Sequence, residues 1–196
     1  MKKVLAVVIA VAFISIGAVN SNAQVPNIQI YFDDLLQETQ AYCEDHFVGE
    51  VDQLYVVMNN FNMFVSTVEF AVDMSGVAGY LLYLGDVHLP GSLFLGNSVL
   101  GAPPGVTITY PLPQNGFAPF ICMKIEVLWQ CDACPQPPVG NFPITVIPHQ
   151  GTGLIQAIEW QTFRQVQGVG MFSLVCPVGV STEETSWGKV KALYNN

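Results

Sequence analysis

Residues 119–129, PFICMKIEVLW, decide the fold, because apolar and other side chains alternate along nearly the whole stretch. A period of two places every apolar side chain on one face of a β-strand. Residues 64–72, FVSTVEFAV, repeat the pattern. The predicted core faces are Ile121, Met123, Ile125, Val127 and Trp129 in the first stretch, and Phe64, Ser66, Val68, Phe70 and Val72 in the second. Both stretches therefore predict strands of a sheet with one buried side.

Shorter apolar runs between Gly and Pro residues predict the other strands of the domain. They are residues 27–32, 53–58, 79–84, 92–95, 105–110, 142–147, 154–160, 162–167 and 171–175. Alternation within 154–160 predicts that Ile158 also lies in the core. Many short strands at near-regular spacing, with almost no helical periodicity between them, are typical of a sandwich or barrel. We therefore predict an all-β protein, an antiparallel β-sandwich of jelly-roll or immunoglobulin-like type, with a short C-terminal helix.

The first 23 residues have the order of charges, apolar residues and small residues that is typical of a secretory signal peptide. Lys2 and Lys3 precede an apolar run over 4–19, and small and polar residues typical of a cleavage region follow at 21–23. The run is shorter than the ~20 residues of a spanning helix. We predict a signal peptide over 1–23, a sandwich domain over 24–178, and no transmembrane segment after cleavage. The expected location is secreted, periplasmic or at the surface of a bacterial cell.

The charge of the chain excludes nucleic acid as a partner. The full chain has 6 basic and 15 acidic residues, so removal of Lys2 and Lys3 leaves 4 against 15, a net charge of −11. Few cations remain to neutralise phosphates. Charged residues make up only 11% of the chain, so few side chains are present that could act as acid or base catalysts.

Five cysteines in an exported chain predict disulfides. Because five is odd, at least one is free or pairs between chains. Cys131 and Cys134 have the spacing of a redox motif, but the prolines that follow preclude the helix that such a site needs. The disulfide candidates are Cys43, Cys122, Cys131, Cys134 and Cys176.

Seven acidic residues fall between positions 33 and 52, with no Lys or Arg among them. Calcium takes hard oxygen ligands from such loops, and Asp33, Asp34 and Glu38 are the candidate ligands. The alternative is a solvated acidic face in which one of the two aspartates caps a turn. No other cofactor is expected.

Residues 179–196 are predicted to form a polar spacer and a short amphipathic helix. Ser181 and Glu184 have capping-box spacing. The helix would carry one apolar stripe, made of Trp187, Val190, Leu193 and Tyr194. We predict that this tail docks or sorts the protein through the stripe; the alternative is that the stripe packs on the sandwich.

The order of segments over 51–129 resembles a cohesin-type sandwich, the module of cellulosome scaffolds. The resemblance rests on LYVVMNN, VSTVEFAVDMSG, LYLGDVHLPGSLF, GVTITYPLPQNG and ICMKIEVLW, in that order. It implies a cohesin-like fold and, since cohesins recognise dockerin partners through a sheet face, a protein-binding role. The ending TSWGKVKALY is similar to uncharacterised secreted bacterial proteins that close on a Trp-Gly-x-Val-Lys-x-Leu-Tyr motif.

The sequence contains no motif of a catalytic serine, a zinc protease, a phosphate-binding loop or an EF-hand. We therefore predict a non-catalytic binding or structural module of the cell envelope or extracellular space, whose partner is a protein or a polysaccharide. One alternative is a carbohydrate-binding module that stacks sugars on Tyr80, Tyr83, Phe94, Tyr110 and Phe117. The other is a glycoside hydrolase, which would need two carboxylates about 5–9 Å apart in a cleft, from among Glu69, Glu126 and Glu159.

Overall fold

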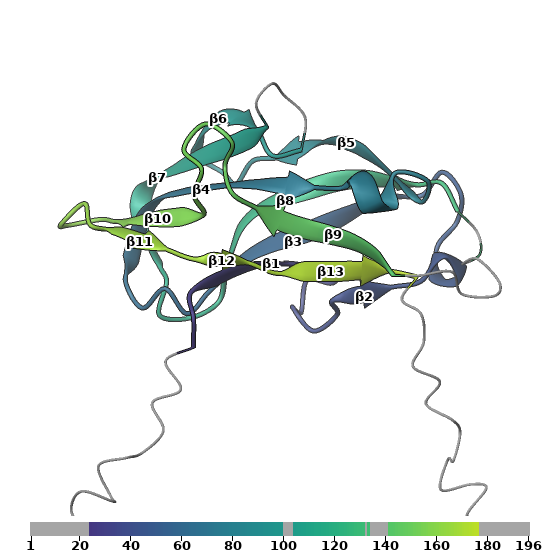
Figure 1. Cartoon of the computed structure of the whole chain (residues 1–196), viewed down its shortest axis with the longest axis horizontal. Coiled ribbons are helices and arrows are strands. Elements are labelled where there is room, and N and C mark those ends of the chain that lie inside the picture. Colours follow the sequence, from purple (N-terminus) through teal and green to yellow (C-terminus); the bar gives the residue numbers. More distant parts are fainter. Residues whose placement is uncertain (1–23, 100–103, 132, 134–140, 177–196) are drawn as a thin grey trace, which may run out of the picture.

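The structure, a computed structural model, describes residues 24–99, 104–131, 133 and 141–176. The predicted signal peptide, Cys134 and the tail with its stripe (Trp187, Val190, Leu193, Tyr194) lie outside the described residues. Two sheets lie face to face as a sandwich (Figure 1). No helix of the described residues is long and apolar enough to cross a bilayer.

One sheet has five strands in the order β12-β1-β3-β8-β5. Its strands are β12 (Val169–Gly170), β1 (Asn27–Tyr31), β3 (Val51–Asn59), β8 (Phe120–Trp129) and β5 (Leu81–Val87). The two long stretches with period two belong to different sheets, because 119–129 forms β8 and 64–72 lies in β4 of the other sheet.

The other sheet has eight strands, six of them in the order β11-β10-β4-β9-β13-β2, and on its far side β4 pairs with β7, which pairs with β6. Its strands are β11 (Gln165–Gln167), β10 (Gln156–Glu159), β4 (Phe64–Asp73), β9 (Phe142–Ile147), β13 (Phe172–Val175), β2 (Gln40–Ala41), β7 (Gly105–Asn115) and β6 (Leu93–Asn97). Two 3₁₀ turns complete the described elements, η1 (Cys43–Asp45) and η2 (Ser75–Val77).

The expectation of a wholly antiparallel sandwich is corrected at two places. The short strands β12 and β2 run parallel to β1 and β13; the strands of each pair are far apart in the sequence, so no hairpin joins them and forces an antiparallel pairing. At β12 the backbone comes so close to β9 that a Cβ on Gly170 would lie 1.7 Å from the carbonyl oxygen of Val146. Only glycine fits at that position.

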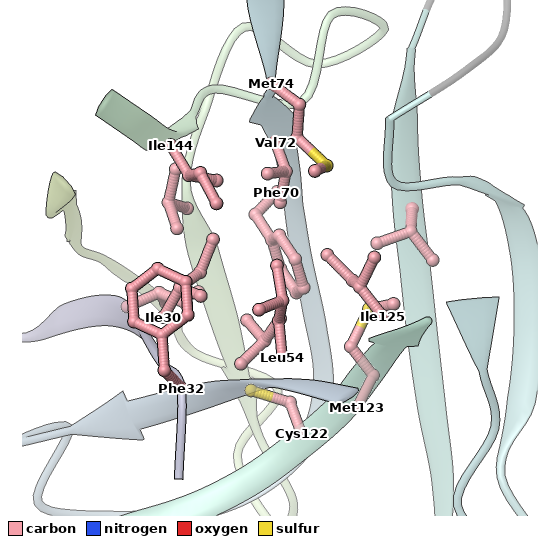
Figure 2. Packing of buried hydrophobic residues seen from close by; sticks show 14 of the residues in the cluster. Ile30, Phe32, Leu54, Phe70, Val72, Met74, Cys122, Met123, Ile125 and Ile144 are labelled. Atoms are coloured by element: carbon pink, nitrogen blue, oxygen red, sulfur yellow. The ribbon is translucent and has the colours of Figure 1, made fainter. Parts of the chain in front are cut away.

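The core lies between the sheets and is built from the alternating apolar faces (Figure 2). Of the residues that alternation predicts to be inward, Val68, Phe70, Ile125 and Val127 are fully buried. Close packing between two sheets of this kind excludes water and supplies the main stabilising term of the fold.

Two β-bulges reverse the alternation locally. Ser66 is an extra residue of β4 opposite β10, so Val65 points inward and Phe64 is exposed. Cys122 is an extra residue of β8 opposite β3, so its side chain joins the core and Ile121 is only half-buried. The predicted inward positions of Phe64 and Ile121 are therefore wrong, since one inserted residue shifts the period of two.

Candidate functional site

The outer surface of the larger sheet presents two rows of side chains that cross five strands. One row runs through Gln165, Ile158, Thr67, Thr109 and Leu93, and the other through Gln167, Gln156, Glu69, Thr107 and Leu95. Their neighbours along the strands, such as Val68 and Ile108, are buried in the core, so these side chains point away from it. We call the eight members on β10, β4, β7 and β6 the Glu69 face: Gln156, Ile158, Thr67, Glu69, Thr107, Thr109, Leu93 and Leu95.

The centre of the Glu69 face is a network of polar side chains. Gln156 Nε2 donates to Glu69 Oε2 at 2.6 Å, and Thr107 Oγ1 donates to Glu69 Oε1 at 3.5 Å. The hydroxyls of Thr67 and Thr109 lie 3.3 Å apart. These contacts hold the carboxylate in one position, because each of its oxygens faces a donor.

One acceptor in this network has no partner. Gln156 is only 4% exposed, and its Oε1 forms no hydrogen bond. A buried polar atom without a partner costs about 1–3 kcal/mol. A donor from a bound molecule would remove that cost once the side chains that cover the atom move aside, so the atom marks the face as a candidate binding surface.

The rim of the face at β6 is apolar. Leu93 and Leu95 are each 60% exposed and stand beside Thr109 and Thr107 in the register. None of the eight residues is basic, and Glu69 carries the only formal charge. The face can therefore offer a partner one carboxylate, hydroxyl and amide groups, and a leucine edge.

The outer face of the five-stranded sheet is more completely paired. Lys124 Nζ donates to Gln53 Oε1 at 3.0 Å and lies 4.9 Å from the centre of the Tyr55 ring. Burial, together with the charges of Asp34 and Asp52, raises the pKa of Tyr55. The Lys124 cation already has partners within the chain. The outer face of the five-stranded sheet is therefore the weaker candidate for a binding surface.

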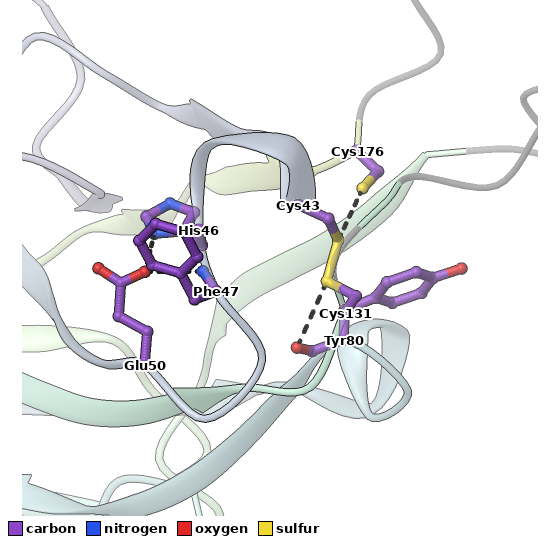
Figure 3. The surroundings of a disulfide bond; sticks show 7 residues. All are labelled: Cys43, His46, Phe47, Glu50, Tyr80, Cys131 and Cys176. Atoms are coloured by element: carbon purple, nitrogen blue, oxygen red, sulfur yellow. Dashed lines mark hydrogen bonds and ion pairs between the residues drawn. A yellow bond between two sulfur atoms is a disulfide. The ribbon is translucent and has the colours of Figure 1, made fainter.

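A disulfide joins Cys43 of η1 to Cys131, just after β8, across 88 residues of sequence (Figure 3). A third sulfur lies at the same corner, with Cys176 Sγ at 3.2 Å from Cys43 Sγ. The prediction of a disulfide is thus matched by one specific pair. Cys122 lies apart from this corner, as a buried thiol in the core. The alternation of side chains along β8 did not predict this position.

The fold is expected to lose stability at alkaline pH because two weak acids are buried in it. Desolvation raises the pKa of Tyr110 above its ordinary 10.0 and that of Cys122 above 9.0. Above those values the unfolded chain has released protons that the folded chain still holds, so the stability that is complete below about pH 9 falls as the pH rises.

The measurement is the melting temperature of the native protein and of Tyr110→Phe between about pH 8 and 11. Tyr110→Phe loses the hydrogen bond to the Cys122 carbonyl oxygen (3.3 Å) and starts about 1 kcal/mol lower, but its decline with pH should be shallower. Tyr42→Phe, at a solvent-exposed tyrosine, is the control. Equal declines in all three proteins would exclude this explanation.

The predicted calcium ligands do not converge. Asp33 Oδ1 accepts the backbone N–H groups of Gln37 (2.9 Å) and Glu38 (2.7 Å), and so closes a turn of its own loop. Among the described residues no three His, Cys, Asp or Glu side chains are arranged to hold a metal ion. A hollow of about 600 Å³ beside this loop is lined by Phe32, Glu38, Tyr42, Asp45 and His46, among others. The calcium site with Asp33, Asp34 and Glu38 remains a prediction.

The three histidines lie in separate surroundings, and none of them forms a nucleophile–base pair with a residue that the structure describes. His46 stacks on Trp129 at 3.8 Å and His88 on Phe94 at 3.9 Å. His149 Nδ1 accepts the N–H of Gly151 at 3.0 Å.

The carboxylates that a glycoside hydrolase would need are also apart. Glu69 lies on the outer face of the larger sheet, whereas Glu126 pairs in register with Gln53 on the outer face of the other. The core separates these two. Glu159 lies 3.6 Å from Arg164, within its own hairpin.

Of the five aromatic residues predicted to stack on sugars, only Phe117 is largely exposed. Tyr110 is buried, and Tyr80, Tyr83 and Phe94 pack against the core. Sequence reasoning therefore selected mainly core aromatics, and it missed Gln156, Leu93 and Leu95, which only strand pairing brings beside Glu69.

The fold is similar to solved cohesin modules. A cohesin module of a Clostridium perfringens family 33 glycoside hydrolase aligns with a TM-score of 0.51 and 8% identity, over 77% of this chain and 95% of that one. CaCohA2 of Clostridium acetobutylicum, in the CaDoc0917–CaCohA2 complex, aligns with a TM-score of 0.50 and 8% identity, over 78% and 99%. No family model and no curated protein matches the chain. The sandwich is therefore cohesin-like in fold.

Proposed function

We propose that this protein is a non-catalytic protein-binding module of the bacterial cell envelope or extracellular space, and that it binds its partner through the Glu69 face. The observation that carries the proposal is the buried, unpartnered Oε1 of Gln156, next to a carboxylate held in place by two donors. A donor from a partner would remove the cost of the unpaired acceptor, and the exposed leucines beside it offer apolar area that a partner can bury.

The chemistry of the face defines the partner. Glu69 calls for a Lys or Arg side chain, Gln156 Oε1 for an N–H or O–H donor, and the two leucines of β6 for apolar side chains. A helix or strand that presents a basic residue beside apolar ones satisfies all three. The CaCohA2 module, similar in fold, is solved in complex with CaDoc0917, which supports a protein as the partner.

Photo-cross-linking tests the proposal with the unknown partner in place. A photoreactive residue at Leu95 should give a protein adduct in the producing cells, whereas the same residue at Leu82, exposed on the other sheet, should not. Against the captured partner, Glu69→Lys should weaken binding at least about tenfold, because the attraction between Glu69 and the partner's basic residue becomes a repulsion between two positive charges.

Glu126→Lys is the matched control, since it makes the same charge change on the opposite sheet and should leave binding unchanged. Adducts from Leu82 but not from Leu95 would move the site to the other sheet. Retention on an insoluble polysaccharide without any protein adduct would favour the carbohydrate-binding alternative.

A further inference from the structure

Four exposed aromatic side chains lie at one end of the sandwich, which we call the aromatic end: Phe64, Phe117, Trp160 and Phe163. The rings of Phe64 and Phe117 touch edge to face, with centroids 5.5 Å apart. The N–H of Trp160 donates to the carbonyl oxygen of Phe64 at 2.8 Å, so the β10–β11 hairpin starts beside that pair. Exposed Leu112 lies in the irregular part of β7 that precedes Phe117.

Two local distortions create this exposure. The bulge at Ser66, whose hydroxyl donates to the Ile158 carbonyl oxygen at 3.0 Å, turns Phe64 out of the core. In the β10–β11 hairpin, Phe163 has φ 55° and is 74% exposed. A bulky residue is rare in the left-handed region, where Gly or Asn is preferred, and such strain often marks a functional position.

The aromatic end also has few acidic residues for a strongly acidic protein: Glu159 precedes Trp160, and its carboxylate lies 3.6 Å from the Arg164 guanidinium. Segments 60–64, 111–118 and 160–164 contain no Asp or Glu, and Arg164 is their only charged residue. The seven acidic residues of 33–52 lie towards the opposite end, since Val51 pairs with Leu128 at the far end of β8. The molecule is therefore polarised along its long axis, with one acidic and one apolar end.

These features match a lipid surface better than a sugar or a protein groove. The β10–β11 hairpin projects from the sandwich (Figure 1). Phe and Leu side chains that project in this way can insert into a fluid apolar phase such as lipid. Sugar sites rely on aromatic platforms ringed by polar groups, whereas the Phe64–Phe117 pair is edge to face.

We propose that the aromatic end inserts into the interfacial layer of a lipid bilayer and holds the domain on the membrane surface, with the acidic end directed away. Trp and Phe favour the boundary between headgroups and acyl chains. The negative charge of the chain selects zwitterionic over anionic lipid. The Glu69 face shares strands β4, β7 and β10 with this end but points sideways from it, so partner binding and membrane contact are separate properties.

The experiment is flotation of chain 24–196 with phosphatidylcholine vesicles, alone or containing one quarter phosphatidylglycerol. The native chain should float with the neutral vesicles and less with the anionic ones. Phe163→Asn and Trp160→Ala should each reduce the partition coefficient at least about tenfold, because each removes a large apolar side chain from the interface. Phe47→Asn is the matched control, since Phe47 is 79% exposed at the acidic end, and its binding should not change.

The melting temperature separates this role from a structural one. Asn adopts the left-handed conformation more readily than Phe, so Phe163→Asn should melt at the same temperature as the native chain or about 2–4 °C higher. Absence of flotation, or flotation that Phe163→Asn leaves intact, would overturn the proposal. Retention on a polysaccharide that Phe163→Asn abolishes, without flotation, would assign the aromatic end to sugars instead.

Discussion

Replacing Cys43 and Cys131 together by Ala is expected to lower the free energy of unfolding by about 4 kcal/mol. The disulfide closes a segment of 88 residues, and a cross-link over that length removes many conformations from the unfolded chain. It also ties η1, next to the edge strand β2 of one sheet, to the end of β8 in the other. A loss of that size is a large part of the about 5–15 kcal/mol by which a typical domain is stable.

Both cysteines are replaced at once because Cys176 Sγ lies 3.2 Å from Cys43 Sγ, so that replacing Cys131 alone would leave Cys43 beside another sulfur with which it could pair. The measurement is urea unfolding without reductant. Cys122→Ala, which removes a buried sulfur but no cross-link, is the control and should cost about 1 kcal/mol. A double variant as stable as this control would show that the cross-link contributes little.

Phe70→Ala is expected to cost about 3–5 kcal/mol. Phe70 is fully buried in β4, between Val68 and Val72, which are also inward. β4 is held by β7 on one side and by β10 and β9 on the other, so the backbone cannot close the cavity that the missing ring leaves. A cavity that persists adds its own cost to the lost transfer free energy of the ring.

Denaturant unfolding also measures this cost, with the slope of the transition checked for two-state behaviour. Phe47→Ala makes the same substitution at an exposed site and should change the free energy of unfolding by less than about 0.5 kcal/mol. If Phe70→Ala cost no more than about 1.5 kcal/mol, the two sheets would have to be able to move together and refill the space.

The alternation within single segments was enough to predict the β class and much of the core, whereas the cohesin-like sandwich was predicted from the resemblance in the order of segments over 51–129. Val68, Phe70, Ile125 and Val127 are inward because a strand has a period of two whatever its neighbours are. Ile158, which alternation also suggested for the core, lies outward on the Glu69 face. Its strand is only four residues long, too short for a period to show which face is buried.

The candidate site was partly visible in the sequence. Thr67 and Glu69 share the face opposite the core residues of 64–72, as their spacing requires. Gln156 comes beside Glu69 across 87 positions of sequence, and Leu95 reaches Thr107 only through the pairing of β6 with β7. No local pattern encodes such a register, because it depends on which strands become neighbours.

By itself, then, the sequence determined where most of the strands lie and which side chains of the regular, longer strands avoid water, because these follow from local geometry and hydrophobicity. Only the tertiary structure decided that Cys43 pairs with Cys131, that Cys122 is buried alone, that the bulge at Ser66 turns Phe64 outward, and that Gln156 Oε1 is left without a donor. Each of these outcomes depends on the partner strand and its register, and residues far apart in the chain set both when the two sheets close around the core.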